Sequence, residues 1–491
     1  MLFPTFSFAV FFITVFYLHW WLVGFPRLRK WLLLAGSLFF YGFWSWKFAG
    51  MLVASAVLNH LVAVYLDRLT DAHARKRVMI FAVAANLSTL GFFKYTRFLT
   101  VDIVLPLIRP LFVWTGHADL LIGGVDTILP LIDEIVLPVG ISFFTFQAMS
   151  YVLDVYWRKI PPARSVLDFA NYLAFFPQLV AGPIVRASDL LPQMEHMPTR
   201  QVALQAPRAT MLILMGLFKK MIIANWLSSH LADPVFANPA AYSSWDILLG
   251  VYGYTLQIYC DFSAYSDIAI GVALLMGYHF PINFNAPYFA VTLQEFWRRW
   301  HISLSTWLRD YLYIPLGGSK QGIWRTRINL FLTFLLGGLW HGAGWTFILW
   351  GAFHGMYLSL ERMARSSLGL PEKPSSTTTW PLAIIGRIWI FHVVAFSWIL
   401  FRSQDMETVR TILSGLVGCD YGVSQLISTQ TVAMLVVGYS VQWMDGDRLC
   451  RFWEKSERVP VAVLAVLAAF LLIVILALAP QGVMPFIYFQ F

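Results

Sequence analysis

The chain has 491 residues, of which 58% are hydrophobic and only 12% charged. A soluble core of that size could not hold so many apolar side chains, so the composition excludes a soluble globular protein and indicates a polytopic membrane protein. The net charge of +9 fits a protein whose basic loops contact anionic membrane lipid, and the basic residues lack the aromatic pattern of a nucleic-acid binder.

Apolar runs of about 20 residues, the length that a helix needs to cross a bilayer, recur along nearly the whole chain. We count roughly eleven to thirteen of them. Several exceed one crossing, which predicts tilted, broken or re-entrant helices. In chain order, the clearest runs cover residues 5–25, 31–49, 51–65, 78–93, 135–157, 209–227, 247–276, 330–360, 384–401, 426–443 and 461–479.

No long polar stretch divides the chain and no internal repeat is present, so we expect a single membrane-embedded domain over residues 1–491. Glycine and proline punctuate its middle third. Non-helical backbone at membrane depth is tolerated only where protein or water satisfies it, so this third is expected to line a cavity. The predicted fold is an all-α transmembrane bundle with re-entrant or interfacial helices.

Basic residues orient the bundle, because short cytoplasmic loops carry the excess of Lys and Arg. Placing the basic clusters inside puts both chain termini outside and requires an even number of crossings. The clusters are Arg27, Arg29 and Lys30; Arg75, Lys76 and Arg77; and Arg448, Arg451, Lys455 and Arg458.

The segment 295–318 has a helical period. Its apolar residues form one stripe and its polar residues fall on the opposite side, so the spacing predicts an amphipathic helix. Such a helix could wall a polar tunnel, or it could be a surface helix with anchoring tryptophans and solvated arginines. The stripe consists of Phe296, Trp300, Leu304, Trp307 and Tyr311, and the polar face of Arg298, His301, Ser305 and Arg309.

His341 lies inside the apolar run 330–360. An imidazole in hydrocarbon loses its hydration, so a titratable group there indicates a functional site, although a satisfied buried histidine is the alternative. His301 precedes it by 40 positions, and together the two predict proton chemistry within the membrane. His354 is 13 residues further on and about 20 Å away in a regular helix, so it need not share their site.

Asp261 and Asp267 occupy another apolar run. We expect them to bind Arg298, Arg299 or nearby backbone and to hold helices around the cavity, because paired-acid catalysis would need them on one helix face. The three cysteines are scattered without paired spacing, so neither a disulfide framework nor a bound metal is expected.

The sequence from Gln294 to Ser305, the following Trp307–Tyr313 stretch, and Gly337-Gly338-Leu339-Trp340-His341-Gly342 resemble the signature of the membrane-bound O-acyltransferase superfamily. The resemblance is nearest to its bacterial branch that acetylates exopolysaccharides such as alginate or cellulose, which is related to the teichoic-acid D-alanylation proteins. It implies a helical bundle around a tunnel that crosses the membrane, with His341 in the place of the catalytic histidine and His301 in a second polar position.

This resemblance implies acyl transfer from acetyl-CoA or another thioester at the cytoplasmic mouth, with no bound cofactor. A neutral His341 could take the proton of an attacking hydroxyl, while His301 or the arginine face orients it or stabilises the oxyanion. The expected partners are a periplasmic or membrane-anchored acetyltransferase and a polysaccharide acceptor, at the bacterial inner membrane. The alternative is a transporter or flippase without covalent chemistry, although many transporters contain repeats that this chain lacks.

The last residues, Met484-Pro485-Phe486-Ile487-Tyr488-Phe489-Gln490-Phe491, look like the aromatic tail of the small partner peptide in D-alanylation systems. A phenol leaves more readily than an alkyl alcohol, so Tyr488 could accept an acyl group and release it again. The alternative is an interfacial aromatic anchor.

Overall fold

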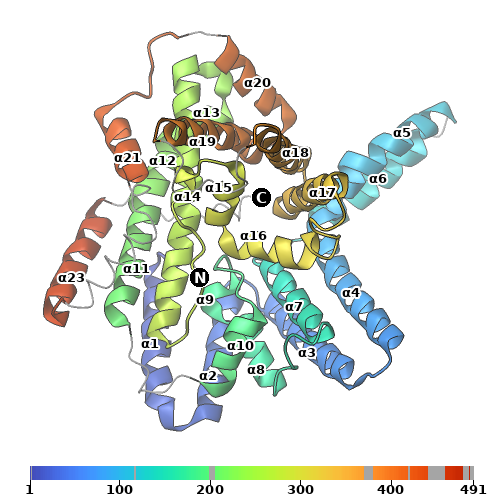
Figure 1. Ribbon diagram of the computed structural model, residues 1–491, viewed down its shortest axis with the longest axis vertical. Helices are drawn as coiled ribbons and strands as arrows, with labels where there is room; N and C mark the ends of the chain where they lie inside the picture. Colours follow the sequence, from blue (N-terminus) through green and yellow to red (C-terminus); the bar gives the residue numbers. More distant parts are fainter. Residues whose placement is uncertain are drawn as a thin grey trace.

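The computed structural model describes residues 1, 3–115, 118–197, 205–369, 380–418, 421–440, 459–478 and 486 of the chain. All regular secondary structure within these residues is helical, which confirms the all-α prediction (Figure 1). The helices of the first part are α1 (Phe6–Trp21), α2 (Pro26–Gly42), α3 (Trp46–Arg68), α4 (Ala72–Phe98), α5 (Leu105–Trp114), α6 (Ala118–Asp133), α7 (Ile141–Tyr156), α8 (Val166–Ala174), α9 (Phe176–Leu179) and α10 (Ala187–His196).

The second part of the chain contains both short helices and the longest described helix, α14 (Ser244–Leu275). The helices of this part are α11 (Ala206–Phe218), α12 (Asn225–Leu227), α13 (Asp233–Ala237), α14, α15 (Leu293–Arg299), α16 (Ile302–Leu308), α17 (Ile323–His341), α18 (Trp345–Ser367), α19 (Trp380–Arg402), α20 (Met406–Val417), α21 (Thr429–Ser440) and α23 (Val461–Leu478). Figure 1 shows α15 to α18 near the centre of the molecule.

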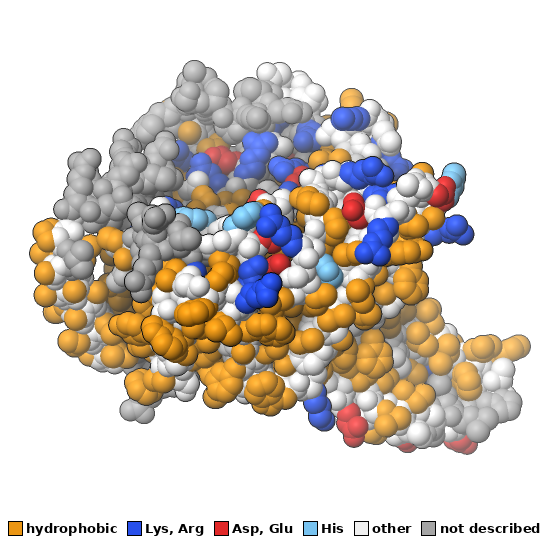
Figure 2. Space-filling model, turned by 90° about the horizontal axis from the view of Figure 1, so that it is seen from below, with side chains coloured by type: hydrophobic (Ala, Val, Ile, Leu, Met, Phe, Trp, Pro, Cys, Tyr) orange, Lys and Arg blue, Asp and Glu red, His pale blue; other side chains and the backbone are white. Residues whose placement is uncertain are grey.

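Six helical segments of the described residues are long and apolar enough to cross a membrane. On the face drawn in Figure 2, a belt of hydrophobic side chains lies below a region where most of the visible Lys and Arg side chains gather. We call the end of the bundle that carries these cations the basic end. The six segments are Phe6–Gly24, Trp46–Arg68, Ala72–Trp114, Ala206–Ala237, Ser244–Leu275 and Pro381–Arg402.

The boundary between two predicted runs was wrong. The second and third runs meet at Phe43–Ser45 rather than at Gly50, because Ser45 is extended and α3 continues through Gly50. The run 330–360 is broken, as expected for its length, at the non-helical turn between α17 and α18. The sequence pattern missed the α5–α6 hairpin, which projects from the bundle in Figure 1.

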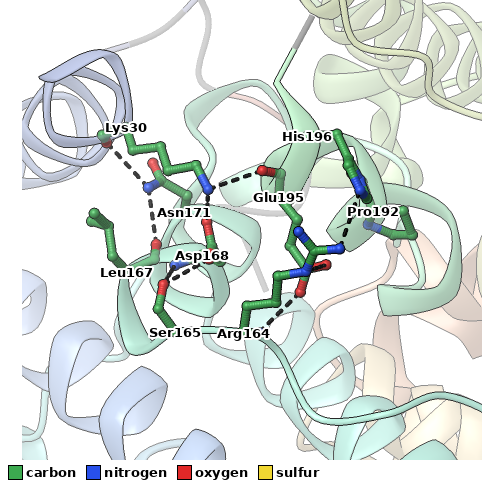
Figure 3. A network of polar contacts seen from close by, with 9 residues as sticks. All are labelled: Lys30, Arg164, Ser165, Leu167, Asp168, Asn171, Pro192, Glu195 and His196. Carbon is green, nitrogen blue, oxygen red and sulfur yellow. Dashed lines mark hydrogen bonds and ion pairs between the residues drawn. The ribbon is translucent and has the colours of Figure 1, made fainter. Parts of the chain in front are cut away.

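Two of the predicted basic clusters lie in the first turns of helices, where their side chains bind neighbouring helices. Lys30 at the start of α2 forms an ion pair with Asp168 of α8 and donates to the Glu195 carbonyl of α10, so one ammonium joins three helices (Figure 3). Arg75 of α4 donates to the carbonyl oxygens of Leu66 and Tyr156, which belong to the last turns of α3 and α7. Residues 448–458, the third cluster, lie outside the described residues.

Candidate functional site

The predicted amphipathic helix over 295–318 is interrupted at its most important residue. α15 ends at Arg299, and α16 begins at Ile302. His301, between them, has a φ of 42°, a left-handed conformation that is strained for a residue with a Cβ. The apolar stripe is buried as predicted, but the break turns His301 away from the polar face of Arg298, Ser305 and Arg309.

His301 instead points into the bundle, where its side chain is fully buried. The rings of Phe143, Phe262 and Phe284 lie 6.5, 4.6 and 6.4 Å from it, measured between centroids. Its Nδ1 lies 3.2 Å from the side-chain oxygen of Asn283 and 3.4 Å from the hydroxyl of Ser303. The imidazole is therefore held in a largely aromatic enclosure.

His341 is the last residue of α17, immediately before the turn that begins at Gly342. It is 5% exposed, with the rings of Trp340, Trp350 and Phe401 at 4.9, 5.2 and 5.2 Å between centroids. His301 lies close enough to interact with it electrostatically. The structure thus brings together the two histidines that the sequence singled out.

Helix α4 holds the end of α17 in place. The Lys94 ammonium donates to the carbonyl oxygens of Trp340 and His341 at 2.5 and 2.9 Å, and the Tyr95 hydroxyl donates to that of Leu339 at 2.8 Å. These carbonyls have no partner within the helix, and a cation near a helix C-terminus is favourable. Lys94 therefore fixes the turn that carries His341.

His341 lines a cavity of about 680 Å³, which we call the distal cavity. Its other lining residues include Tyr41, Lys94, Phe143 and Trp340. Lys94 also lines a neighbouring cavity of about 570 Å³, with Gly342. The catalytic candidate is thus open to molecules of the size of a sugar or a short peptide, as ligand pockets of this volume commonly are.

A second large cavity, of about 620 Å³, lies toward the other end of α17, and we call it the basic cavity. Three of the four residues of the polar face predicted from the sequence, Arg298, Ser305 and Arg309, line it, and α18 adds Arg362 and Arg365. Its lining residues include four arginines and one carboxylate, that of Glu361. Such a cavity suits an anionic ligand, because guanidinium groups bind phosphate in a bidentate manner.

Asp310 balances part of this charge. It forms ion pairs with Arg309 at 2.6 Å and with Arg186 at 2.5 Å. Partial burial works to raise the pKa of Asp310, but the hydrogen bonds from both arginines outweigh it and lower the pKa below its ordinary value. Asp310 therefore stays ionised and holds Arg309 at the rim of the basic cavity.

None of the described residues lines both cavities, and α17 connects them. Phe334 lines the basic cavity and Trp340 the distal one, which places them about 9 Å apart along the helix axis. Trp297 packs on Phe334, with centroids 5.0 Å apart, at the boundary. The structure therefore has a chamber toward each end of α17, and a continuous tunnel stays a prediction.

Asp261 and Asp267 are paired as expected, but with other partners than Arg298 and Arg299. Asp261 lies 2.7 Å from Lys220, and Asp267 lies 2.5 Å from Lys219. Both lysines belong to a π-helical segment that follows α11. The two aspartates therefore join α14 to this segment.

The remaining predicted residues are placed as follows. His354 lies in mid-helix, where it accepts from Trp297 Nε1 at 3.3 Å and contacts Ser397 at 3.1 Å. His392, expected to be structural, bonds the Tyr252 hydroxyl at 2.9 Å. Tyr488 lies outside the described residues.

Comparison with known proteins shows the family to which a chain with this arrangement belongs. A model of the MBOAT, membrane-bound O-acyltransferase family, matches residues 160–401, which include α15 to α18 and both histidines. The probable alginate O-acetylase AlgI of Azotobacter vinelandii is 36% identical, with 95% of each chain covered. The chain belongs to the membrane-bound O-acyltransferase family.

Two other relatives extend the range of acceptors within the family. The peptidoglycan O-acetyltransferase of Helicobacter pylori is 38% identical over 82% of this chain and 75% of its own. The teichoic acid D-alanyltransferase of Streptococcus thermophilus is 29% identical over 53% of this chain and 67% of its own. These findings confirm a multi-pass membrane O-acyltransferase, and the flippase alternative is not retained.

Sequence reasoning missed four residues that shape the site. Lys94 follows an apolar run directly, and a cation at that depth is itself a signal of function. Arg362 and Arg365 of α18 follow the apolar run 330–360, and the sequence pattern did not single them out. Asn283 lies in a loop, and nothing in the local pattern distinguishes it.

Proposed function

We propose that this O-acyltransferase takes an acetyl group from a cytoplasmic thioester such as acetyl-CoA and passes it through the membrane for O-acetylation of an exported polysaccharide. The observation that carries the proposal is the placement of the two chambers. The arginine-lined cavity lies toward the first half of α17. Lys320, Arg325 and Arg327 gather at that end of the helix, and the positive-inside rule assigns such a basic end to the cytoplasm. The His341 cavity lies toward the opposite end of α17.

The chemistry begins with an attacking hydroxyl in the distal cavity. His341, neutral in its aromatic enclosure, takes the hydroxyl proton as the oxygen attacks the thioester carbonyl, and the proton passes to the departing sulfur. One C–O bond forms and one C–S bond breaks. The separation of about 9 Å between the chambers along α17 can be crossed by a slender arm that carries the thioester at its tip.

Relatives that act on alginate and peptidoglycan support an exported polysaccharide as the final acceptor. A polymer outside the inner membrane calls for a periplasmic or membrane-anchored acetyltransferase as partner. With the basic clusters in the cytoplasm, both termini of the chain are periplasmic, and the C-terminal tail lies on the side where such a partner works.

Substitution of the arginines that line the basic cavity tests whether acetyl-CoA is the donor. In purified protein supplied with labelled acetyl-CoA, we expect acetyl release, and Arg298→Ala and Arg362→Ala should each raise the KM for acetyl-CoA roughly tenfold with little change in kcat. The reason is the loss of a charge-assisted contact to phosphate, worth about 1.4 kcal/mol.

Arg27→Ala is the matched control, because this exposed arginine of α2 belongs to a predicted basic cluster but does not line the basic cavity. Its KM should equal that of the unchanged protein. Equal KM values in all four proteins, or no consumption of acetyl-CoA, would refute the cavity as a site for this donor.

Tyr488 offers a second test. If its phenol oxygen attacks the thioester, a tyrosine acetyl ester forms and the thiol leaves, after which an acceptor hydroxyl attacks the ester and restores the phenol. Tyr488→Phe should then abolish acetylation of the exported polymer, measured as its acetyl content in cells. Unchanged acetyl content would dismiss the relay and leave Tyr488 as an anchor.

A further inference from the structure

Asn283 is a buried amide in the loop between α14 and α15, and it binds the strained start of α16. Its backbone oxygen accepts from Ile302 N at 2.9 Å. Its side-chain oxygen accepts from the backbone N–H and the hydroxyl of Ser303, at 3.1 and 2.9 Å. One residue therefore holds the chain on the far side of His301 by three hydrogen bonds.

These bonds determine which atom of the amide is oxygen. The backbone N–H of Ser303 can only donate, so the Asn283 atom that faces it must accept. The other atom of the amide, Nδ2, donates to the Ser266 hydroxyl at 3.0 Å, which is consistent with the same orientation. The amide orientation thus follows from an unambiguous donor.

The orientation of Asn283 in turn determines the tautomer of His301. His301 Nδ1 lies 3.2 Å from the Asn283 oxygen, and an oxygen of this kind can only accept. The Ser303 hydroxyl is more distant from Nδ1, at 3.4 Å, and it donates its hydrogen to the Asn283 oxygen at 2.9 Å. Nδ1 must therefore carry a hydrogen of its own. In a neutral imidazole, which its aromatic enclosure favours, Nε2 then has a lone pair and no hydrogen.

His301 Nε2 is buried and has no hydrogen-bond partner within the described part of the chain. A buried acceptor without a partner costs free energy, about 1–3 kcal/mol. The backbone strain at His301 adds to this cost. Both costs are understandable if a group that arrives with the substrate supplies the missing donor.

We propose that Asn283 is a positioning residue, which keeps His301 in the Nδ1-protonated tautomer so that Nε2 accepts a hydrogen bond from an O–H or N–H group of the bound substrate. In this arrangement His301 orients the substrate beside His341. It does not donate to the oxyanion, because Nε2 bears no hydrogen. The inference rests on the proposed function only for the identity of the substrate.

The tautomer can be measured without an activity assay. In ¹⁵N-histidine-labelled protein in lipid bilayers, the two ring nitrogens of each tautomer give distinct chemical shifts. The difference between the spectra of the unchanged protein and His301→Gln assigns the signals of His301 among the 11 histidines. We expect a protonated Nδ1 and an unprotonated Nε2. A protonated Nε2 would overturn the proposal at once.

Variants of Asn283 test the consequence for the reaction. Asn283→Leu should shift His301 toward the other tautomer and lower kcat roughly 100-fold. Asn283→Asp retains an accepting oxygen, so it should keep the tautomer and recover at least a tenth of the activity. Ser266→Ala is the control, because it removes the contact on the Nδ2 side only, and its activity should remain within about threefold.

The outcomes separate the two hypotheses. The proposal fails if a stably folded Asn283→Leu protein, judged by its melting temperature, keeps both the tautomer and the activity. If the unchanged protein has the expected tautomer but does not consume acetyl-CoA, the proposed donor fails and the assignment of His301 stands.

Discussion

Replacing His341 by alanine should lower acyl transfer by a factor of about 10²–10⁴, the usual contribution of a general base. The ring is the imidazole that lines the distal cavity, and it sits at a helix end fixed by two bonds from Lys94. Those bonds go to backbone carbonyls, so they survive the substitution. The measurement is the turnover of labelled acetyl-CoA in the presence of the acceptor, with the melting temperature recorded in parallel.

His392→Gln is the matched control for this loss. His392 is a histidine of α19 with two hydrogen bonds, to Tyr252 and to the Ile388 carbonyl, and it lines none of the cavities described above. Its turnover should stay within about threefold of the unchanged protein. If His341→Ala keeps more than a tenth of the activity with an unaltered melting temperature, His341 is not the base.

The class of fold could be predicted because each apolar run of the sequence supports it independently. Hydrophobic residues make up 58% of the chain and recur along nearly all of it. An error in a single boundary, such as the one at Ser45, therefore does not change the prediction of a helical membrane bundle. The stripe from Phe296 to Tyr311 was also predictable as a buried face, since α15 and α16 each keep a helical period.

The position of His301 could not be predicted from that period. A helical pattern continues through residues 300 and 301, and histidine gives no warning of a left-handed φ as glycine would. The break depends on Asn283, whose backbone and side-chain oxygens take the N–H groups of Ile302 and Ser303 from 19 and 20 residues away. Tertiary hydrogen bonds of this kind override a local pattern.

The partners of Asp261 and Asp267 were missed for a related reason. A buried carboxylate needs a cation, and the arginines at positions 298 and 299 were the nearest ones after them in sequence. The structure supplies Lys219 and Lys220 from a π-helical segment that precedes α14. Helix packing, which no pattern in a single segment reveals, decides which cation is close.

Glycine at 351 should be nearly as important as the histidine, although it has no chemistry of its own. A Cβ at Gly351 would lie 2.3 Å from the Phe334 carbonyl oxygen, and one at Gly338 would lie 2.3 Å from that of Phe347. Both contacts are with backbone atoms, which cannot move aside as a flexible side chain would. Close approach through small residues is what joins helices in a membrane.

Gly351→Ala should therefore push α18 away from α17 and destabilise the protein by about 1–3 kcal/mol or more. It should also displace His341 at the end of α17, and a shift of about 1 Å in a catalytic group can cost 100-fold in rate. The measurements are the melting temperature and the turnover of acetyl-CoA by the fraction that remains folded.

Gly337→Ala is the matched control, because its Cβ would meet only the Leu308 side chain at 3.4 Å, an ordinary contact. Alanine is also the better helix former, by about 1 kcal/mol, so stability should be unchanged or raised. Equal behaviour of Gly351→Ala and Gly337→Ala would mean that the α17–α18 contact does not position His341. A loss confined to Gly351→Ala would mean that the reaction depends on how closely these two backbones approach.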